Sequence, residues 1–399
     1  MSTDSHASVS RLHNAILLGS LSFGILQFAL PIYARQLGAS ALDIGGVISI
    51  FALMITILRP LVGWGIDRWG RKGFLELSLV FYGLSMLIFG FAQSLGMLYA
   101  ARLVQGIGSS LFWIPAYTVV TELSTRDWGR SVGSVDMFSS RGGFVGTFLG
   151  FFIILNAGSF AAGWQWAFDL YAAAAFVGAL IIWRFVPETR TKAEASTPDD
   201  TAAASSLERK YMLRLMLVVL ITSASSSMIS PLLIIFLQDR FHADIRMLAT
   251  AFIPAAVVYA FLPGVLGSLS DRFGRAPLMA AGLVGAGVVS LGMPASISLV
   301  FLAFLWVLEA IGLSAASPAE AALVADLAGQ NVRGRGYGMY MFAMGLGFII
   351  GPLVGGWLYD AAGHAFPFYA NGVILFLGAG LVLWLLRATP RRVVLHGAE

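Results

Sequence analysis

The sequence contains no cysteine and little charge. Charged residues make up 12% of its 399 positions and hydrophobic residues 58%, and the mean hydropathy is +0.82. The absence of cysteine excludes disulfides and thiol chemistry. A soluble globular domain has about 25% charged residues, so the shortage of charge excludes that class and predicts a chain that folds in lipid.

Two further absences narrow the chemistry. No Walker-type phosphate loop occurs, which argues against ATP as the energy source. None of the five histidines is expected at mid-membrane depth, so a histidine proton relay is not predicted. We expect no cofactor, no resident metal and no enzymatic activity.

Twelve apolar runs are long enough to cross about 30 Å of hydrocarbon at about 1.5 Å per residue. They lack the period-two alternation of a membrane β-barrel, so each run predicts a helix. The first run has no small-residue cleavage site, which predicts an uncleaved helix instead of a signal peptide. The runs cover residues 15–34, 44–66, 74–92, 98–120, 132–155, 164–186, 211–237, 248–269, 277–293, 297–327, 336–358 and 365–386.

Basic residues are distributed unevenly between the segments that join these runs. If the N-terminus is cytoplasmic, 18 lysines and arginines fall on that side of the membrane and 3 on the other. This asymmetry predicts that both termini are cytoplasmic. The pI near 9.4 therefore reflects membrane topology, and we expect no nucleic-acid partner.

A polar segment divides the chain into two halves. Residues 187–210 include the sequence Glu-Ala-Ser-Thr-Pro-Asp-Asp-Thr, which is typical of a flexible linker. We predict an N-terminal six-helix bundle over residues 1–186, a cytoplasmic linker over 187–210 and a C-terminal six-helix bundle over 211–399.

One motif occurs in both halves. The pattern G-x-x-x-D-R-x-G-R begins at Gly63 and again at Gly267, an offset of 204 residues, which predicts an internal duplication. Its glycines allow a close helix approach and a tight turn, and its Asp and Arg residues can form ion pairs. The motif residues are Gly63, Asp67, Arg68, Gly70, Arg71 and Lys72 in the first half, and Gly267, Asp271, Arg272, Gly274 and Arg275 in the second.

The duplication, the linker and the twice-used motif resemble the major facilitator superfamily over essentially the whole chain. The resemblance implies an all-α membrane protein with twelve transmembrane helices in two six-helix bundles related by pseudo-two-fold symmetry. It also implies alternating access, in which the motif acts as a cytoplasmic gate and its basic residues pair with Glu122 or Asp136. Alternatively, these basic residues serve only the positive-inside distribution.

Ionisable residues inside the apolar runs are candidates for proton coupling. Glu309 lies near mid-depth, where desolvation favours a carboxyl that can gain and lose a proton. Glu320, lower on the same run, belongs to the same expected network. By the family resemblance, Arg102 would influence proton transfer, and we group Asp136 with it. The alternatives are a permanent bridge between Glu309 and an arginine, and a structural Arg102 bonded to carbonyls of a broken neighbouring helix.

Polar and aromatic residues are candidates for the substrate cavity. In the family's arrangement the first and seventh helices line the cavity, which makes Gln27 a wall residue. Trp113 and Trp306 could stack on an apolar or cationic substrate, although helix packing is the commoner role. Gln105 occupies the repeat position of Glu309, and Arg141 could bind an anionic solute.

Glycines spaced four apart occur in the fifth and eleventh runs. The eleventh has the form G-x-x-x-G-P-x-x-G-G, which resembles a motif of proton-coupled drug exporters of the superfamily. The fifth keeps the glycine spacing but has Thr147 for proline and Phe151 for the last glycine. Such glycines let helices slide closely past each other. The expected hinge residues are Gly146, Gly150, Gly351, Pro352 and Gly355.

Two local features are predicted from short-range chemistry. Ser40 and Asp43 form the pattern of a capping box that starts a helix. Trp164 and Trp166 fall where the outer membrane interface is expected, and tryptophan is enriched there as an anchor.

Together these features predict a secondary active transporter in a bacterial-type inner membrane. The favoured activity is proton-coupled antiport that exports amphipathic or drug-like compounds. Its expected partners are a small-molecule substrate, protons and the lipid bilayer, with a monomer as the functional unit. The alternatives are a proton-coupled importer of an anionic metabolite, a lipid or lysolipid flippase and, from a different class, a non-transporting receptor.

Overall fold

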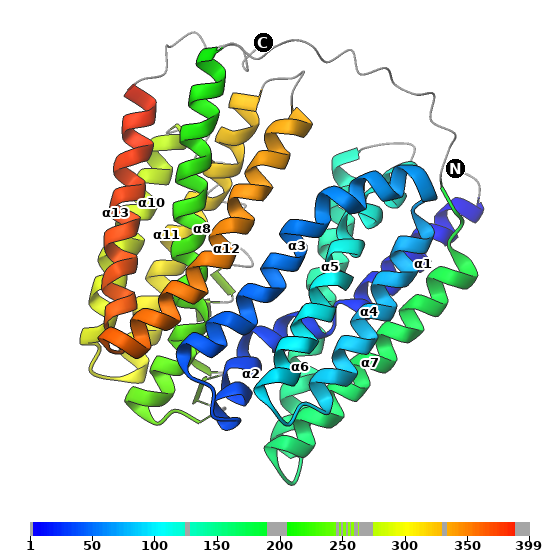
Figure 1. Ribbon diagram of the computed structural model, residues 1–399, viewed down its shortest axis with the longest axis horizontal. Coiled ribbons are helices and arrows are strands. Elements are labelled where there is room, and N and C mark those ends of the chain that lie inside the picture. Colours follow the sequence, from blue (N-terminus) through cyan, green and yellow to red (C-terminus); the bar gives the residue numbers. More distant parts are fainter. Residues whose placement is uncertain are drawn as a thin grey trace. The chain divides into compact units, whose positions relative to one another are not determined.

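All regular structure in the described part of the chain is helical (Figure 1). The computed structural model describes residues 3–123, 128–189, 206–244, 274–328 and 333–387, with scattered positions between 247 and 262. The chain divides into two compact units, Met1–Ala39 with Gly46–Ser196, and Ser40–Gly45 with Thr197–Glu399. The helices confirm the all-α class that the long apolar runs predict.

The first unit is built from long helices that pack side by side. Within it, α4 packs against α5 and α7, while α6 packs against α1, α2 and α7. Their bounds are α1 Thr3–Gly19, α2 Ser22–Gln36, α3 Ala41–Trp69, α4 Lys72–Gly90, α5 Leu95–Leu123, α6 Trp128–Asn156 and α7 Phe160–Phe185. The first residues of α3 are grouped with the second unit by their contacts.

The second unit repeats this construction. Here α8 packs against α12 and α13, and α10 packs against α11 and α13. The bounds are α8 Ser206–Phe241, α10 Arg275–Gly292, α11 Leu299–Ala328, α12 Arg333–Ala362 and α13 Phe366–Arg387, with a 3₁₀ turn at Met293–Ala295. Most of the predicted run 248–269 lies outside the described residues.

Eleven helical spans in the described ranges are long and apolar enough to cross a membrane. The first predicted span is interrupted, because α1 ends at Gly19 and α2 begins at Ser22. The capping box at the start of α3 is confirmed: the Ser40 amide donates to Asp43 Oδ2 at 2.9 Å, and the Asp43 amide donates to Ser40 Oγ at 3.1 Å.

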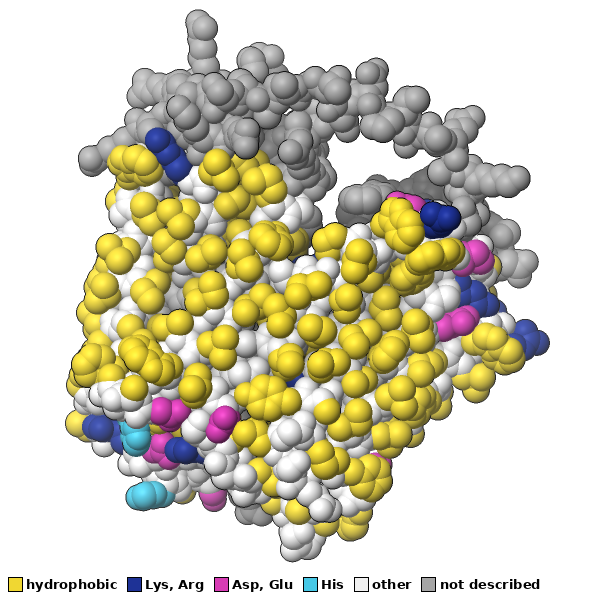
Figure 2. Space-filling model, in the orientation of Figure 1, with side chains coloured by type: hydrophobic (Ala, Val, Ile, Leu, Met, Phe, Trp, Pro, Cys, Tyr) yellow, Lys and Arg dark blue, Asp and Glu magenta, His cyan; other side chains and the backbone are white. Residues whose placement is uncertain are grey.

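The surface of the described helices is largely apolar. In Figure 2 hydrophobic side chains cover the middle of the visible face, and charged side chains gather toward the ends of the helices. Large exposed side chains such as Phe144, Phe152 and Trp183 belong to this apolar surface. Because lipid tails are themselves apolar, such a surface is stable in a bilayer and would aggregate in water.

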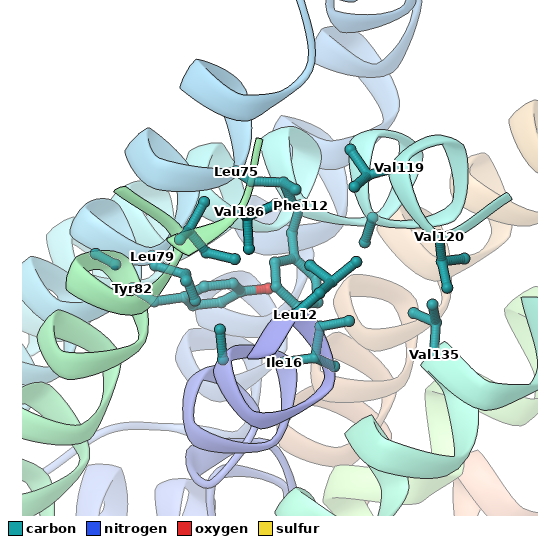
Figure 3. Close-up of a cluster of buried hydrophobic side chains, with 14 of the residues drawn as sticks. Leu12, Ile16, Leu75, Leu79, Tyr82, Phe112, Val119, Val120, Val135 and Val186 are labelled. Carbon is teal, nitrogen blue, oxygen red and sulfur yellow. The ribbon is translucent and has the colours of Figure 1, made fainter. Parts of the chain in front are cut away.

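A buried apolar cluster joins the helices of the first unit (Figure 3). In lipid the hydrophobic effect between helices is weak, so close van der Waals packing holds such a cluster together. Its members include Leu12, Ile16, Leu75, Leu79, Tyr82, Phe112, Val119, Val120, Val135 and Val186. This cluster fixes α1, α4, α5 and α6 and so positions the polar residues described next.

Candidate functional site

The turn between α3 and α4 is organised around Gly70 and Arg71. Gly70 has φ +97°, a left-handed conformation that favours glycine. Arg71 Nη2 lies 3.0 Å from Glu122 Oε1 at the end of α5, and 4.0 Å from Asp67 Oδ1. The structure therefore brings together Gly70, Asp67, Arg71 and Glu122 from the sequence-predicted gate motif.

Glu188, which the sequence analysis assigned to the linker, also belongs to this turn. Its two carboxylate oxygens accept hydrogen bonds from the amides of Arg71 at 2.9 Å and Lys72 at 3.1 Å. These are first-turn amides of α4, so the carboxylate satisfies donors that a helix leaves unpaired. A Cβ at Gly70 would lie 2.5 Å from Glu188 Oε2. Steric crowding is therefore a second reason, besides the positive φ, why this position needs glycine.

The remaining motif residues differ in their contacts. Lys72 Nζ donates to the Trp183 carbonyl at 2.7 Å, and the Arg68 guanidinium lies 5.4 Å from the centre of the exposed Trp64 ring. A Cβ at Gly63 would meet no described atom within 4 Å. The close helix approach expected at Gly63 therefore stays a prediction.

The second copy of the motif is described only in part. Gly274 has φ +90° and directly precedes α10, where Arg275 is the first residue. The copy thus reproduces the left-handed glycine of the first. Gly267, Asp271 and Arg272 lie outside the described residues.

Arg102 is buried inside α5 beside aromatic rings. Its exposed fraction is 8%, and its Nη1 donates to Gln105 Oε1 at 2.8 Å. The guanidinium carbon lies 5.2 Å from the Phe51 ring centre and 5.9 Å from that of Phe89. Within the described residues the charge is thus balanced by an amide oxygen and ring faces, and not by a carboxylate.

Asp136 and Trp113 lie in one polar and aromatic region of the first unit. The Tyr117 hydroxyl of α5 donates to Asp136 Oδ1 of α6 at 2.6 Å. The Trp113 ring lies 5.8 Å from Tyr117 and 6.2 Å from Phe23 of α2, measured between ring centres. Tyr117 was missed by the sequence analysis, although it stands four residues from Trp113 and so on the same face of α5.

Other predicted cavity residues have separate surroundings. The exposed Arg141 guanidinium lies 5.4 Å from the centre of the Phe138 ring. The same ring stacks on His13, with 4.3 Å between the ring centres. Gln27 is exposed on α2. In the second unit, Trp306 makes an edge contact with Phe252 at 4.0 Å between ring centres.

Glu309 is the buried carboxyl of α11, with an exposed fraction of 3%. Its described hydrogen-bond partner is the Nδ2 of Asn371 on α13, at 3.5 Å. The same nitrogen donates to Ser290 Oγ of α10 at 2.9 Å, and Asn371 Oδ1 accepts from Ser225 of α8. This set, Glu309, Asn371, Ser290 and Ser225, joins four helices and is called the Asn371 network below.

Asn371 was missed by the sequence analysis, although a lone amide in an apolar run is itself a signal. Amides buried in lipid are costly unless they are bonded, so such residues mark polar contacts between helices. Here Asn371 is 2% exposed, and its oxygen and nitrogen both have partners. The alternative expectation was a permanent bridge between Glu309 and an arginine. Among the described residues the partner of Glu309 is instead the amide of Asn371.

The glycine series of α6 and α12 provide close helix contacts. In the first unit Gly146 faces the Leu21 carbonyl, and Gly150 faces Tyr171 and Ile25. In the second unit Gly351 faces the Ala224 carbonyl and Ser227, and Gly355 faces Met228 and Leu232 of α8. Pro352 lies inside α12. The α6 series therefore packs against the first predicted span and α7, and the α12 series packs against α8.

The fold and these buried polar clusters define a polytopic helical membrane protein with two compact units. The family model of the Major Facilitator Superfamily matches the chain twice, over residues 12–215 and 215–398. The chain therefore belongs to the major facilitator superfamily, and the two matches support the duplication that the repeated motif predicts.

Known relatives of this chain include drug resistance proteins. It is 26% identical over 387 residues to multidrug resistance protein 2 of Bacillus subtilis (strain 168), covering 92% of each chain. It is 34% identical over 168 residues to the class C tetracycline resistance protein of Escherichia coli, covering 39% of this chain and 40% of that protein. Among solved structures, a bacterial homologue of the human lysosomal transporter Spinster is similar in fold, with a TM-score of 0.80, 17% identity and 98% coverage of both chains.

Proposed function

We propose that this chain is a secondary active transporter that works by alternating access and exchanges protons for amphipathic or drug-like small molecules, which it exports. The observation that carries the proposal is Glu309, a carboxyl 3% exposed inside α11 whose described partner is the neutral amide of Asn371. A carboxylate buried without a cationic partner costs several kcal/mol, whereas the neutral acid costs far less. Proton uptake at Glu309 can therefore be linked to its exposure to water.

The proposed substrate class is argued from residues of the first unit. Trp113, Tyr117 and Phe23 offer half-buried ring faces next to the exposed carboxylate of Asp136. Ring faces bind apolar bodies and cations, and a carboxylate attracts a cationic head group. This combination suits an amphipathic organic cation, in keeping with the multidrug and tetracycline resistance proteins among the relatives.

The membrane setting follows from the distribution of charge. We infer an inner-membrane protein whose N- and C-termini are cytoplasmic, because 18 basic residues fall on that side and 3 on the other. The turn with Gly70, Arg71 and Glu122 then lies on the cytoplasmic side, where its ion pair would hold the gate. One chain would supply a complete pathway, so we infer a functional monomer.

The proposal is tested with everted membrane vesicles that carry a pH gradient. Addition of tetraphenylphosphonium, a lipophilic cation, should dissipate the gradient when the wild-type chain is present. The Glu309→Gln variant should lose this response, while Asp169→Asn, an acid-to-amide change in α7 of the other unit, should keep it. Coupled transport that survives Glu309→Gln would contradict the proposed proton site.

A second candidate is uptake of an anionic metabolite with protons. It is favoured by Arg102, a buried guanidinium whose described partners are Gln105 and two aromatic rings and include no carboxylate. Entry of an anionic solute beside it would supply the missing negative charge. Uptake of a carboxylate driven by an inward proton gradient, lost in Arg102→Gln, would support this function. No response to carboxylates together with a response to the lipophilic cation would exclude it.

A further inference from the structure

Two buried carboxyls in the second unit lie on one face of α11. Glu309 and Glu320 are 11 residues apart, which is about three helical turns and about 16 Å along the axis. Their exposed fractions are 3% and 8%. Since 11 residues return a side chain to nearly the same direction, both carboxyls point to the same side of the helix.

Glu320 is hydrogen-bonded to side chains of α8 and α12, whereas the described partner of Glu309 is Asn371 of α13. The Thr222 hydroxyl of α8 donates to Glu320 Oε2 at 2.8 Å, and the Tyr340 side chain of α12 also hydrogen-bonds it. The Asn371 network reaches α8 as well, through the hydroxyl of Ser225. Thr222 and Ser225 are three residues apart, so the two carboxyls are connected to adjacent turns of one helix.

Among the described contacts of these two carboxyls there is no basic residue. By sequence, α8 has no ionisable side chain between Arg214 and Asp239, α10 has none after Arg275, and α13 has only Tyr369 before Arg387. On α11 itself the other acid is Asp326, and α12 contributes Arg333, Arg335, Tyr337, Tyr340, Tyr359 and Asp360. Within the described residues neither carboxyl has an ion pair, and a proton can neutralise each of them.

We propose that Glu320 is a second proton-binding group, and that Glu309 and Glu320 act together because both hold α8. This proposal rests on the proposed proton-coupled transport and extends it from one carboxyl to two. Each carboxyl takes up one proton from water and releases one to water, so two protons are bound when both are neutral. Loss of a proton from Glu320 changes its bond to Thr222, and loss from Glu309 changes the Asn371 network one turn further along α8.

The glycine contacts of α12 fit this role for α8. Gly347, Gly351 and Gly355 form a strip without side chains along which α8 packs, and α8 contains Pro231. Such a strip permits small shifts of one helix along another. A shift of α8 would therefore alter the contacts of both carboxyls at once. Conversely, protonation of either carboxyl would change which position of α8 is favoured.

The test counts protons released when a ligand binds. Purified full-length protein in detergent and weak buffer is mixed with saturating tetraphenylphosphonium, and the released protons are measured with a pH indicator dye. Glu320→Gln and Glu309→Gln should each lower the number released per protein by about half, and the double variant should abolish release. Thr222→Val should weaken the pH dependence of binding, whereas Thr222→Ser should preserve it.

A matched control is available on the same helix. Ser314 is buried on α11, and its hydroxyl has no hydrogen-bond partner in the described part of the protein, so Ser314→Ala should leave proton release unchanged. The role of Glu320 would be overturned if the Glu320→Gln variant released as many protons per protein as the wild type. This result counts only if the variant binds the ligand and its melting temperature shows an intact fold. Undiminished release by Glu309→Gln with reduced release by Glu320→Gln would contradict the proposed site at Glu309 and keep that at Glu320, so the two failures are distinct.

Discussion

At the scale of single residues, the best-defined chemistry is that of Arg71. Its guanidinium is held by Glu122, by the Ile66 carbonyl at 3.3 Å and by the more distant Asp67. Its main-chain amide binds Glu188. One residue thus joins the ends of α3, α5 and α7, and a change in any of these helices must rearrange charge-assisted bonds worth about 1.5–3 kcal/mol each.

The left-handed glycines of the two motif copies, Gly70 and Gly274, allow the cost of backbone strain to be separated from the cost of steric crowding. Gly70→Ala combines a positive φ with a Cβ that would collide with Glu188, whereas at Gly274 the nearest described atom would be 3.5 Å away. We expect Gly274→Ala to cost about 1–2 kcal/mol from strain alone, and Gly70→Ala to cost more. Thermal melting of both purified variants checks this, and equal losses would mean that Glu188 imposes no constraint on Gly70.

The tryptophans show where residue-level prediction needs the neighbouring helices. Trp164 was expected at the membrane interface, but its side chain is fully buried and its Nε1 donates to the Phe89 carbonyl at 2.7 Å. Trp166 is exposed. Two residues apart on a helix point in nearly opposite directions, so only one of the pair can face lipid, and the expectation was wrong for Trp164.

At the scale of helices, the close contacts of α12 with α8 make a sharp prediction. A Cβ at Gly351 would collide with the Ala224 carbonyl, and this backbone atom cannot rotate away, whereas a Cβ at Gly380 on α13 would meet no described atom within 4 Å. Gly380→Ala should be neutral or stabilise by up to about 1 kcal/mol through helix propensity. Gly351→Ala should destabilise by about 1–3 kcal/mol through overpacking and lower transport.

Melting temperature and drug efflux rate, measured on both alanine variants, decide this point. The same sign of change in both variants would show that α12 is not tightly seated on α8. The comparison is informative because the two substitutions are chemically identical and differ only in what the new methyl group meets.

At the scale of the whole molecule, the natural absence of cysteine makes the topology directly testable. Gln93 is an exposed residue between α4 and α5, and Arg68 is exposed near the end of α3. With cytoplasmic termini, Gln93→Cys should react with a membrane-impermeant maleimide in intact cells, whereas Arg68→Cys should react only in everted vesicles. The cysteine-free parent provides the blank, and the opposite pattern would invert the proposed orientation.

The sequence by itself determined the class of the fold, because long apolar runs in lipid must satisfy their backbone hydrogen bonds internally. It also determined the duplication, through a motif repeated at an offset of 204 residues, and it singled out Glu309 as a carboxyl with little charge nearby. These properties are local along the chain or periodic in it, so a linear reading is enough to find them.

Only the tertiary structure decided which polar groups meet. The contact of Glu309 with Asn371 spans 62 residues, that of Thr222 with Glu320 spans 98, and that of Arg71 with Glu188 spans 117. Helix packing sets these pairings, because in lipid the position and rotation of each helix depend on small residues and van der Waals fit across the bundle. The sequence of a single helix does not specify which neighbouring helix its polar side chain will contact.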